Sequence, residues 1–172
     1  GDGQMCDAVI DRGTLLAIMQ AAKKADDSLL RDYAETTVAV ADIKIAVRSM
    51  KTGKNKDFMK RAMAECNTLD IDRLATAAVA GMEEIERYLA DTAYAGGAEA
   101  LSESASAFER WCDNRIIETI KPQKYNPFTV GPIVAYILAR LNEIKTVRII
   151  LTCKLNQLPE EAIRERVREM YV

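Results

Sequence analysis

The fold is decided by the stretch from Asn126 to Val172, NPFTVGPIVAYILARLNEIKTVRIILTCKLNQLPEEAIRERVREMYV. Its first part predicts one long helix, because prolines stand at its start and apolar residues recur at helical spacing. The run Leu158-Pro159-Glu160-Glu161 then predicts the start of a shorter, charged helix, since proline fits the first helical turn and acids favour the positive helix end. We therefore expect two helices that meet at a corner.

The composition favours helices throughout the chain. The chain has 172 residues, of which 49% are apolar, with only 3 Phe and 1 Trp, so it can bury one sizeable core or two small ones. A formal charge of -2 gives no basic footprint, and we expect no nucleic-acid partner. No apolar run reaches the length of a membrane span and no signal-peptide pattern is present, so we expect neither a spanning helix nor secretion.

Upstream of the decisive stretch, apolar residues recur at spacings of three and four in five segments. These predict helices over residues 10–24, 29–50, 56–66, 71–92 and 98–121. Asp26-Asp27-Ser28 supplies capping residues for the second of them. The first four residues are expected to be a frayed lead-in, and the absence of an initiator methionine suggests a piece of a longer protein. No segment alternates with period two, so the predicted class is all-α.

A long-helix, corner, short-helix unit, preceded by one further helix, occurs twice in the sequence. Shifting by 104 places residues 29–33 on 133–137 and 43–47 on 147–151, and a shift of 102 places Asp11 on Asp113. Chance similarity between amphipathic helices is the alternative explanation. The repeat predicts two related helical-bundle domains, residues 1–105 and 106–172.

The two copies share a misfit. Lys44 in the first copy and Arg148 in the second interrupt an apolar stripe at equivalent positions. A basic side chain there must either extend to solvent or pair with a carboxylate. We predict that Asp11 pairs with Lys44 and that Asp113 pairs with Arg148, each within roughly 4 Å. Extension to solvent is the alternative, and it suits Lys44 better than Arg148.

The sequence lacks the usual ingredients of several catalytic sites. It contains no histidine, which excludes Ser-His-Asp, Cys-His and His-metal arrangements. The cysteines form no CxxC pair and are expected to be reduced, buried thiols in a cytosolic protein, with a disulfide or a reactive thiol as the alternative. The 4 cysteines are Cys6, Cys66, Cys112 and Cys153.

Phosphate-binding and carboxylate motifs are also missing. No P-loop is present, and Gly96-Gly97 lacks the surrounding pattern of a phosphate cradle. The acidic pairs Glu83-Glu84 and Glu160-Glu161 are typical of solvated faces or helix starts rather than of catalytic dyads. We therefore predict no catalytic residue, no cofactor and no metal site.

Residues 130–167 resemble the C-terminal end of the C subunit of archaeal and bacterial A/V-type ATP synthases, the counterpart of the d subunit in eukaryotic V-ATPases. Residues 41–45 and the turn at Gly53 echo the family's earlier repeat more weakly, and Ile133 and Ala39 stand where the family pattern has acids. The features that carry the resemblance are Gly131-Pro132, Tyr136, Asn142-Glu143-Ile144, Val147-Arg148-Ile149-Ile150 and Leu158-Pro159-Glu160-Glu161-Ala162-Ile163-Arg164.

The resemblance implies a mechanical role. Family members are longer and have three related helical domains arranged as a funnel, so the chain would be the second and third of these. It implies a non-catalytic rotor subunit, peripheral on the cytoplasmic face of the membrane, that couples the central stalk to the proteolipid ring for proton or sodium transport during ATP synthesis or hydrolysis. Surfaces facing a missing first domain would be exposed and apolar, and the chain would then self-associate.

Two other classes of function stay open on the sequence alone. One is an unrelated all-α protein-interaction scaffold, which failure to bind a proteolipid ring or a central stalk would favour. The other is an all-α enzyme that uses carboxylates or a thiol, such as Cys153 beside Lys154. A deep pocket that contains acids with perturbed pKa values would support the enzyme.

Overall fold

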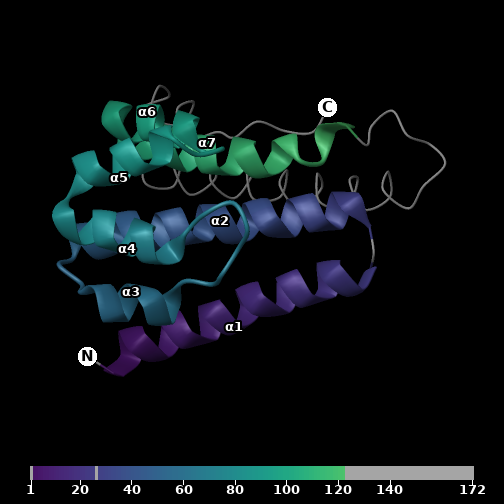
Figure 1. Ribbon diagram of the computed structural model, residues 1–172, viewed down its shortest axis with the longest axis horizontal. Helices are drawn as coiled ribbons and strands as arrows, with labels where there is room; N and C mark the ends of the chain where they lie inside the picture. Colours follow the sequence, from purple (N-terminus) through teal and green to yellow (C-terminus); the bar gives the residue numbers. More distant parts are fainter. Residues whose placement is uncertain (1, 26, 123–172) are drawn as a thin grey trace, which may run out of the picture. The chain divides into compact units, whose positions relative to one another are not determined.

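The computed structural model describes the backbone of residues 2–25 and 27–122, and the side chains from residue 12 onward except those of residues 14 and 25. Within these residues every regular element is a helix, which confirms the all-α class (Figure 1). The helices are α1 (Asp2–Ala25), α2 (Ser28–Lys51), α3 (Lys56–Ala62), α4 (Ile71–Ala80), α5 (Met82–Ala90), α6 (Ala95–Glu103) and α7 (Ala105–Glu118).

The described residues belong to two compact units. The first ends at Glu99 and the second begins at Ala100. Within the first unit, α2 is the central helix: it runs antiparallel to α1 and also packs against α3, α4 and α5 (Figure 1). The domain boundary predicted after residue 105, and the second copy of the repeat beyond it, stay predictions.

Helix α2 is buried on several sides because four other helices cover it. Ala39, Ile43 and Ala46 are fully buried, whereas Tyr33 and Thr37, which belong to the apolar stripe that Lys44 interrupts, are only half-buried. A single stripe therefore underestimates what this helix buries. Covering a mostly apolar helix on several sides stabilises the unit through the apolar area removed from water.

Three helices of the first unit begin at a side-chain cap. Asp27 accepts a hydrogen bond from the N–H of Leu30 at 3.0 Å, as the sequence predicts for the start of α2. Asn55 accepts one from the N–H of Phe58 at 2.9 Å at the start of α3. Asp70 caps α4 in the same way. Each cap satisfies a first-turn N–H that has no partner inside its own helix.

The predicted helix boundaries are wrong at four places. Residues 2–4, expected to be a frayed lead-in, already belong to α1. Helix α3 ends at Ala62 and not at residue 66, because the chain turns to an extended conformation at Met63. The helix predicted over 71–92 is two helices, α4 and α5, with Gly81 between them.

The fourth correction concerns the segment after Tyr94. Helix α6 already begins at Ala95, so Gly96 and Gly97 lie inside a helix that the sequence pattern predicts only from residue 98. The predicted helix is also divided at Ser104, whose hydroxyl accepts a hydrogen bond from the N–H of Ala107 at 3.0 Å. Serine caps helices well, and this cap starts α7.

Replacing Gly81 by alanine is expected to lower the free energy of unfolding by roughly 1–2 kcal/mol. Gly81 has φ 138° and ψ 178°, a conformation that residues with a Cβ rarely adopt. A Cβ there would meet no atom within 4 Å, so the cost comes from the backbone and not from a clash. Urea denaturation followed by circular dichroism measures the change.

The matched control is Gly13→Ala, which places alanine in open space on α1. Alanine is the better helix former there, so this variant is expected to be neutral or stabilised by up to about 1 kcal/mol. A Gly81→Ala protein as stable as the wild type would contradict the assignment of strain to this break.

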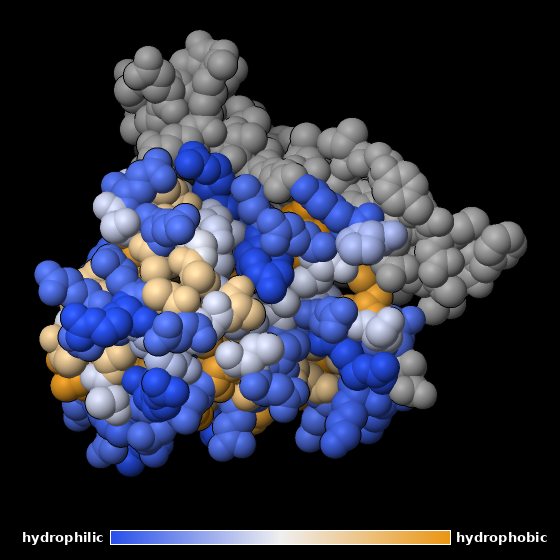
Figure 2. Space-filling model, turned by 45° about the horizontal axis from the view of Figure 1, so that its top comes forward, coloured by the Kyte–Doolittle hydropathy of each residue, from blue (hydrophilic) through white to orange (hydrophobic). Residues whose placement is uncertain are grey.

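The surface of the described residues is mostly polar on the face shown in Figure 2. Among the side chains that the structure describes, the large apolar ones that stand exposed are Leu16 on α1 and Val79 on α4. Among residues 2–25 and 27–122, no helix combines the length and the apolarity that a bilayer crossing requires. Self-association of the chain stays a prediction.

Candidate functional site

The segment between α3 and α4, residues 63–69, is held by side chains from other elements, and we call it the clamp loop. Its residues are not helical, so their backbone N–H and C=O groups need partners elsewhere. Partners for several of these groups come from α1 and α2, and the Thr68 side chain also bonds to Tyr94, which precedes α6. Connections between helices usually deform easily, but this one is held at several points.

Glu35 of α2 holds the far end of the clamp loop. Its carboxylate accepts the N–H groups of Asn67 and Thr68, each at 2.7 Å, the Thr68 hydroxyl at 2.8 Å and the Asn67 side-chain amide at 3.3 Å. Thr68 Oγ1 also lies 2.7 Å from the hydroxyl of Tyr94, which is 1% exposed. Because Thr68 gives its hydrogen to Glu35, Tyr94 donates to Thr68.

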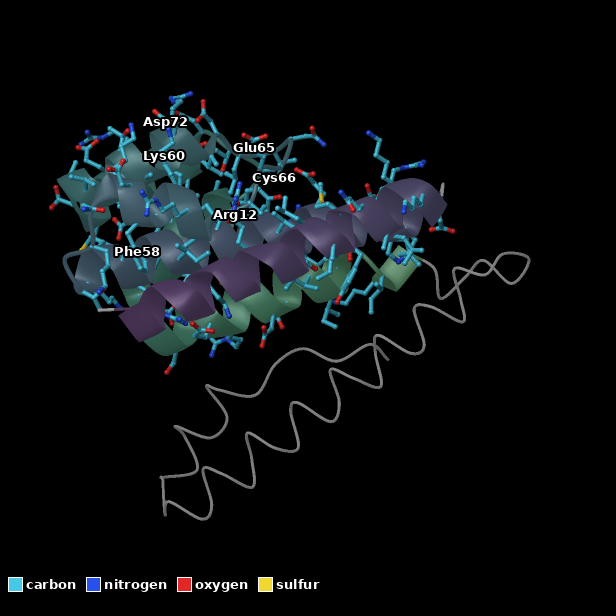
Figure 3. The ribbon with its side chains drawn as sticks, turned by 90° about the horizontal axis from the view of Figure 1, so that it is seen from below. Arg12, Phe58, Lys60, Glu65, Cys66 and Asp72 are labelled. Atoms are coloured by element: carbon cyan, nitrogen blue, oxygen red, sulfur yellow. The ribbon has the colours of Figure 1, made fainter. Side chains whose placement is uncertain are left out.

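Arg12 and Asp42 hold the near end of the clamp loop from two different helices. Arg12 Nε, on α1, donates to the carbonyl oxygen of Met63 at 2.8 Å. Asp42 Oδ1, on α2, accepts the N–H of Ala64 at 3.0 Å. Figure 3 shows Arg12 reaching from α1 toward this loop. The C=O of Met63 and the N–H of Ala64 belong to one peptide group, so this group, just after the end of α3, is held by α1 at its oxygen and by α2 at its nitrogen.

Asp42 is a buried acid with a strongly shifted pKa. Its side chain is 0% exposed, and burial raises its pKa from 3.8 to about 7, against the lowering effect of the Ala64 N–H and of Arg12. The negative charge of Glu35 adds a smaller increase. A carboxyl group with this pKa holds its proton at a much higher pH than an aspartate in water does.

Cys66 of the clamp loop is a half-buried thiol. Burial, with smaller contributions from the charges of Glu35 and Asp42, raises its pKa to about 11. The thiolate, which is the nucleophilic form, is therefore scarce at neutral pH. Cys112 is a buried thiol on α7, so reduced thiols are confirmed for these two positions. The side chain of Cys6 and the whole of Cys153 lie outside the described residues.

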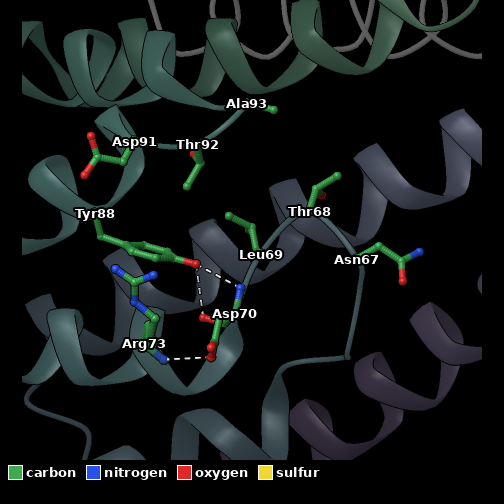
Figure 4. Close-up of a pocket in the computed structure, with 9 residues that line it drawn as sticks. All are labelled: Asn67, Thr68, Leu69, Asp70, Arg73, Tyr88, Asp91, Thr92 and Ala93. Carbon is green, nitrogen blue, oxygen red and sulfur yellow. Dashed lines mark hydrogen bonds between the residues drawn. The ribbon is translucent and has the colours of Figure 1, made fainter.

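A hollow of about 450 Å³ adjoins the clamp loop (Figure 4). Tyr88 crosses it: the Tyr88 hydroxyl accepts the N–H of Asp70 at 2.8 Å, and the Arg73 guanidinium lies 5.2 Å from the centre of the Tyr88 ring. Burial raises the pKa of Tyr88. The hollow is lined by Asn67, Thr68, Leu69, Asp70, Arg73, Tyr88, Asp91, Thr92 and Ala93.

A second hollow of about 360 Å³ lies beside the first, and the two share Arg73, Tyr88 and Asp91. Both are open. The first carries one arginine and two carboxylates and the second carries two arginines and two carboxylates, an arrangement suited to receiving polar side chains of a partner protein. Asp42 lines neither of these two hollows. Within the described part of the chain, no three carboxylates and thiols are grouped so as to hold a metal ion.

Helices α3 and α4 are joined by a charge cluster at the surface. Asp72 accepts hydrogen bonds from Lys56 and Lys60, both at 2.9 Å, and Figure 3 shows Lys60 beside Asp72. These two bonds lower the pKa of Asp72 to about 2. The cluster is exposed, and its contribution to stability is correspondingly small.

The predicted charge pairs fall mostly outside the described residues. Lys44 is half-buried on α2 and Asp113 is buried on α7. The side chain of Asp11 and the whole of Arg148 are not described, so both pairs stay predictions. Glu83 and Glu84 lie in the first turn of α5, which confirms the prediction of a helix start, whereas Glu160-Glu161 lies outside the described residues.

Arg12, Glu35 and Asp42 are the residues of this site that the sequence pattern does not predict. One signal was available: Asp42 interrupts the apolar run VAVADIKIAV of residues 38–47 as plainly as Lys44 does. Glu35 gave no such signal, because an acid outside the apolar stripe of a helix is common.

Known proteins resemble this chain over most of its length. The family model described as ATP synthase (C/AC39) subunit matches residues 1–166. The C subunit of the A-type ATP synthase of Methanocaldococcus jannaschii is 27% identical over 156 residues, and the match covers 86% of this chain and 39% of that protein. No solved structure matches. Because the family match spans nearly the entire sequence, the chain belongs to the ATP synthase (C/AC39) subunit family, as its C-terminal stretch predicts.

Proposed function

We propose that the chain is a non-catalytic subunit that couples the central stalk of an A/V-type ATP synthase to the proteolipid ring of the membrane sector. The observation that carries the proposal is the family match over residues 1–166, supported by a relative named as the C subunit of an A-type ATP synthase. The ion moved by the ring would be a proton or sodium. The chain would lie at the cytoplasmic face of the membrane as a peripheral subunit.

The first unit has features that suit a mechanical role. A part that transmits torque must resist deformation, and connections between helices are the usual soft points of a helical bundle. In this unit the clamp loop is fixed by Arg12, Glu35 and Asp42 from two helices, and Lys56 and Lys60 join α3 to α4 through Asp72. These cross-links support a stiff first unit.

The experiment tests binding to both partners with the full chain. Tagged chain is mixed with detergent-solubilised proteolipid ring, with isolated central-stalk subunits, and with both together, and the bound proteins are identified after affinity capture. The expected result is that the tagged chain captures the ring, captures the stalk subunits, and captures both together from the mixture. Capture of neither partner would overturn the proposal and favour an unrelated scaffold.

A second readout tests the non-catalytic part of the proposal. The chain alone is expected to hydrolyse no ATP, while its addition to a complex depleted of the corresponding subunit is expected to restore ATP-driven ion transport. The matched pair of variants is Glu35→Ala, which releases the clamp loop, and Asp32→Ala, which removes an exposed acid from the same helix. If stiffness matters, the first variant lowers transport per ATP and the second does not.

A further inference from the structure

Asp42 is an incompletely satisfied acid in the interior of the first unit. Its side chain is 0% exposed, and Oδ1 accepts the N–H of Ala64 at 3.0 Å. Oδ2 is buried and has no hydrogen-bond partner among the described residues. An ionised carboxylate in this position would leave half of its accepting capacity unused in a medium that solvates charge poorly, which is costly. A neutral carboxyl group avoids most of that cost.

The charges around Asp42 only partly offset its burial. Arg12 approaches from α1 and favours the ionised form, but its Nε is already committed to the carbonyl oxygen of Met63. Glu35, on α2 itself, disfavours the ionised form. From the clamp loop the facing groups are the Ala64 N–H and the thiol of Cys66, which is uncharged at neutral pH.

We propose that Asp42 is a proton-binding switch that controls how firmly the clamp loop is attached to α2. With the proton bound, the buried group is neutral and the Ala64 N–H stays on Oδ1. When the proton leaves, the buried charge is relieved by opening the near end of the loop, which lets water reach the carboxylate. The switch adds a regulated contact to the cross-links that stiffen the unit.

The position of the clamp loop connects this switch to the surface. Residues 67–70 form one wall of the hollow that Tyr88 crosses. Opening of the loop at Ala64 loosens that wall, because the near end then loses one of its two side-chain contacts and keeps Arg12, while Glu35 and Tyr94 still hold the far end. Proton occupancy of Asp42 thereby changes the face formed by α4 and α5.

The test is amide hydrogen exchange measured by NMR on the full chain at about pH 6 and about pH 8, corrected for the intrinsic pH dependence of exchange. Opening exposes Asp42 to water, where its pKa is near 3.9, and in the closed loop it is about 7. The protection of the Ala64 N–H is therefore expected to fall by about 10-fold over this range. The N–H of Phe58, bonded to the neutral side chain of Asn55, is the internal reference.

Asp42→Asn is the deciding variant, because asparagine keeps an Oδ1 acceptor and cannot ionise. It is expected to remove the pH dependence of Ala64 protection while Phe58 is unchanged. An equal fall in the variant would overturn the proposal. Should the variant fail to fold, the side-chain carboxyl ¹³C resonance of Asp42 in the wild type decides alone: a titration near neutral pH supports the switch, and an ionised group throughout overturns it. Neither readout depends on binding to the ring or the stalk.

Discussion

Asp42→Asn is expected to flatten the pH dependence of the free energy of unfolding by roughly 2–3 kcal/mol between about pH 5 and about pH 8. The pKa of Asp42 is about 7 in the folded protein and near 3.9 in the unfolded chain, so the folded state binds this proton more tightly. The stability gained from the bound proton is complete below about pH 4 and is lost as the pH rises through about 7. Asparagine does not ionise, so the free energy of unfolding of the variant does not fall for this reason as the pH rises.

The measurement is urea denaturation of both proteins at a series of pH values. At about pH 5 the two are expected to agree to within about 1 kcal/mol, because the Ala64 N–H keeps its acceptor and only the group at the Oδ2 position changes. Above neutral pH the variant becomes the more stable protein. Asp32→Asn, an exposed acid on the same helix, is the control and should leave the pH dependence as it is. If the free energy of unfolding changed with pH equally in Asp42→Asn and in the wild type, the result would contradict this prediction.

The sequence predicts the helical class and most of the helices because apolar spacing is a local property. It does not predict where the helices are interrupted. The break at Gly81 lies inside a pattern that stays apolar at threes and fours on both sides, from Leu74 to Leu89. The signal was the pair of acids after Gly81, which is typical of a new helix start. The apolar periodicity, which continues past Gly81, predicted a single helix in spite of this signal.

The clamp loop could not be predicted in the same way, because its partners are distant in sequence. Asp42 and Ala64 are separated by 22 residues, and Glu35 and Thr68 by 33. The unusual residue Lys44 marks one side of α2 in the sequence pattern. Asp42 is two residues away, and two residues along a helix correspond to about 200° of rotation. The buried side chain at Asp42 therefore points away from Lys44, and a helix covered on several sides has more than one core face.

Glu35→Ala is expected to lower the free energy of unfolding by roughly 2–3 kcal/mol. One carboxylate accepts two backbone N–H groups, a hydroxyl and an amide, so its removal leaves four donors of the clamp loop to find other partners. A hydrogen bond to a charged group contributes more to stability than an average one. The far end of the loop is exposed, however, so water can take over part of each lost bond in the variant. Alanine is also the better helix former, which offsets a few tenths of a kcal/mol.

Asp32→Ala provides the matched control, because it removes an exposed acid from the same helix and is expected to change stability by less than about 0.5 kcal/mol. A double-mutant cycle of Glu35→Ala with Tyr94→Phe then tests the connection through Thr68. Both side chains bond to Thr68 Oγ1, so their effects are expected to be non-additive by about 0.5 kcal/mol or more. Additive effects would mean that Glu35 and Tyr94 hold the loop independently. The predicted coupling arises because a hydroxyl oriented by one partner presents its lone pair to the other, which makes the loop end a single cooperative anchor.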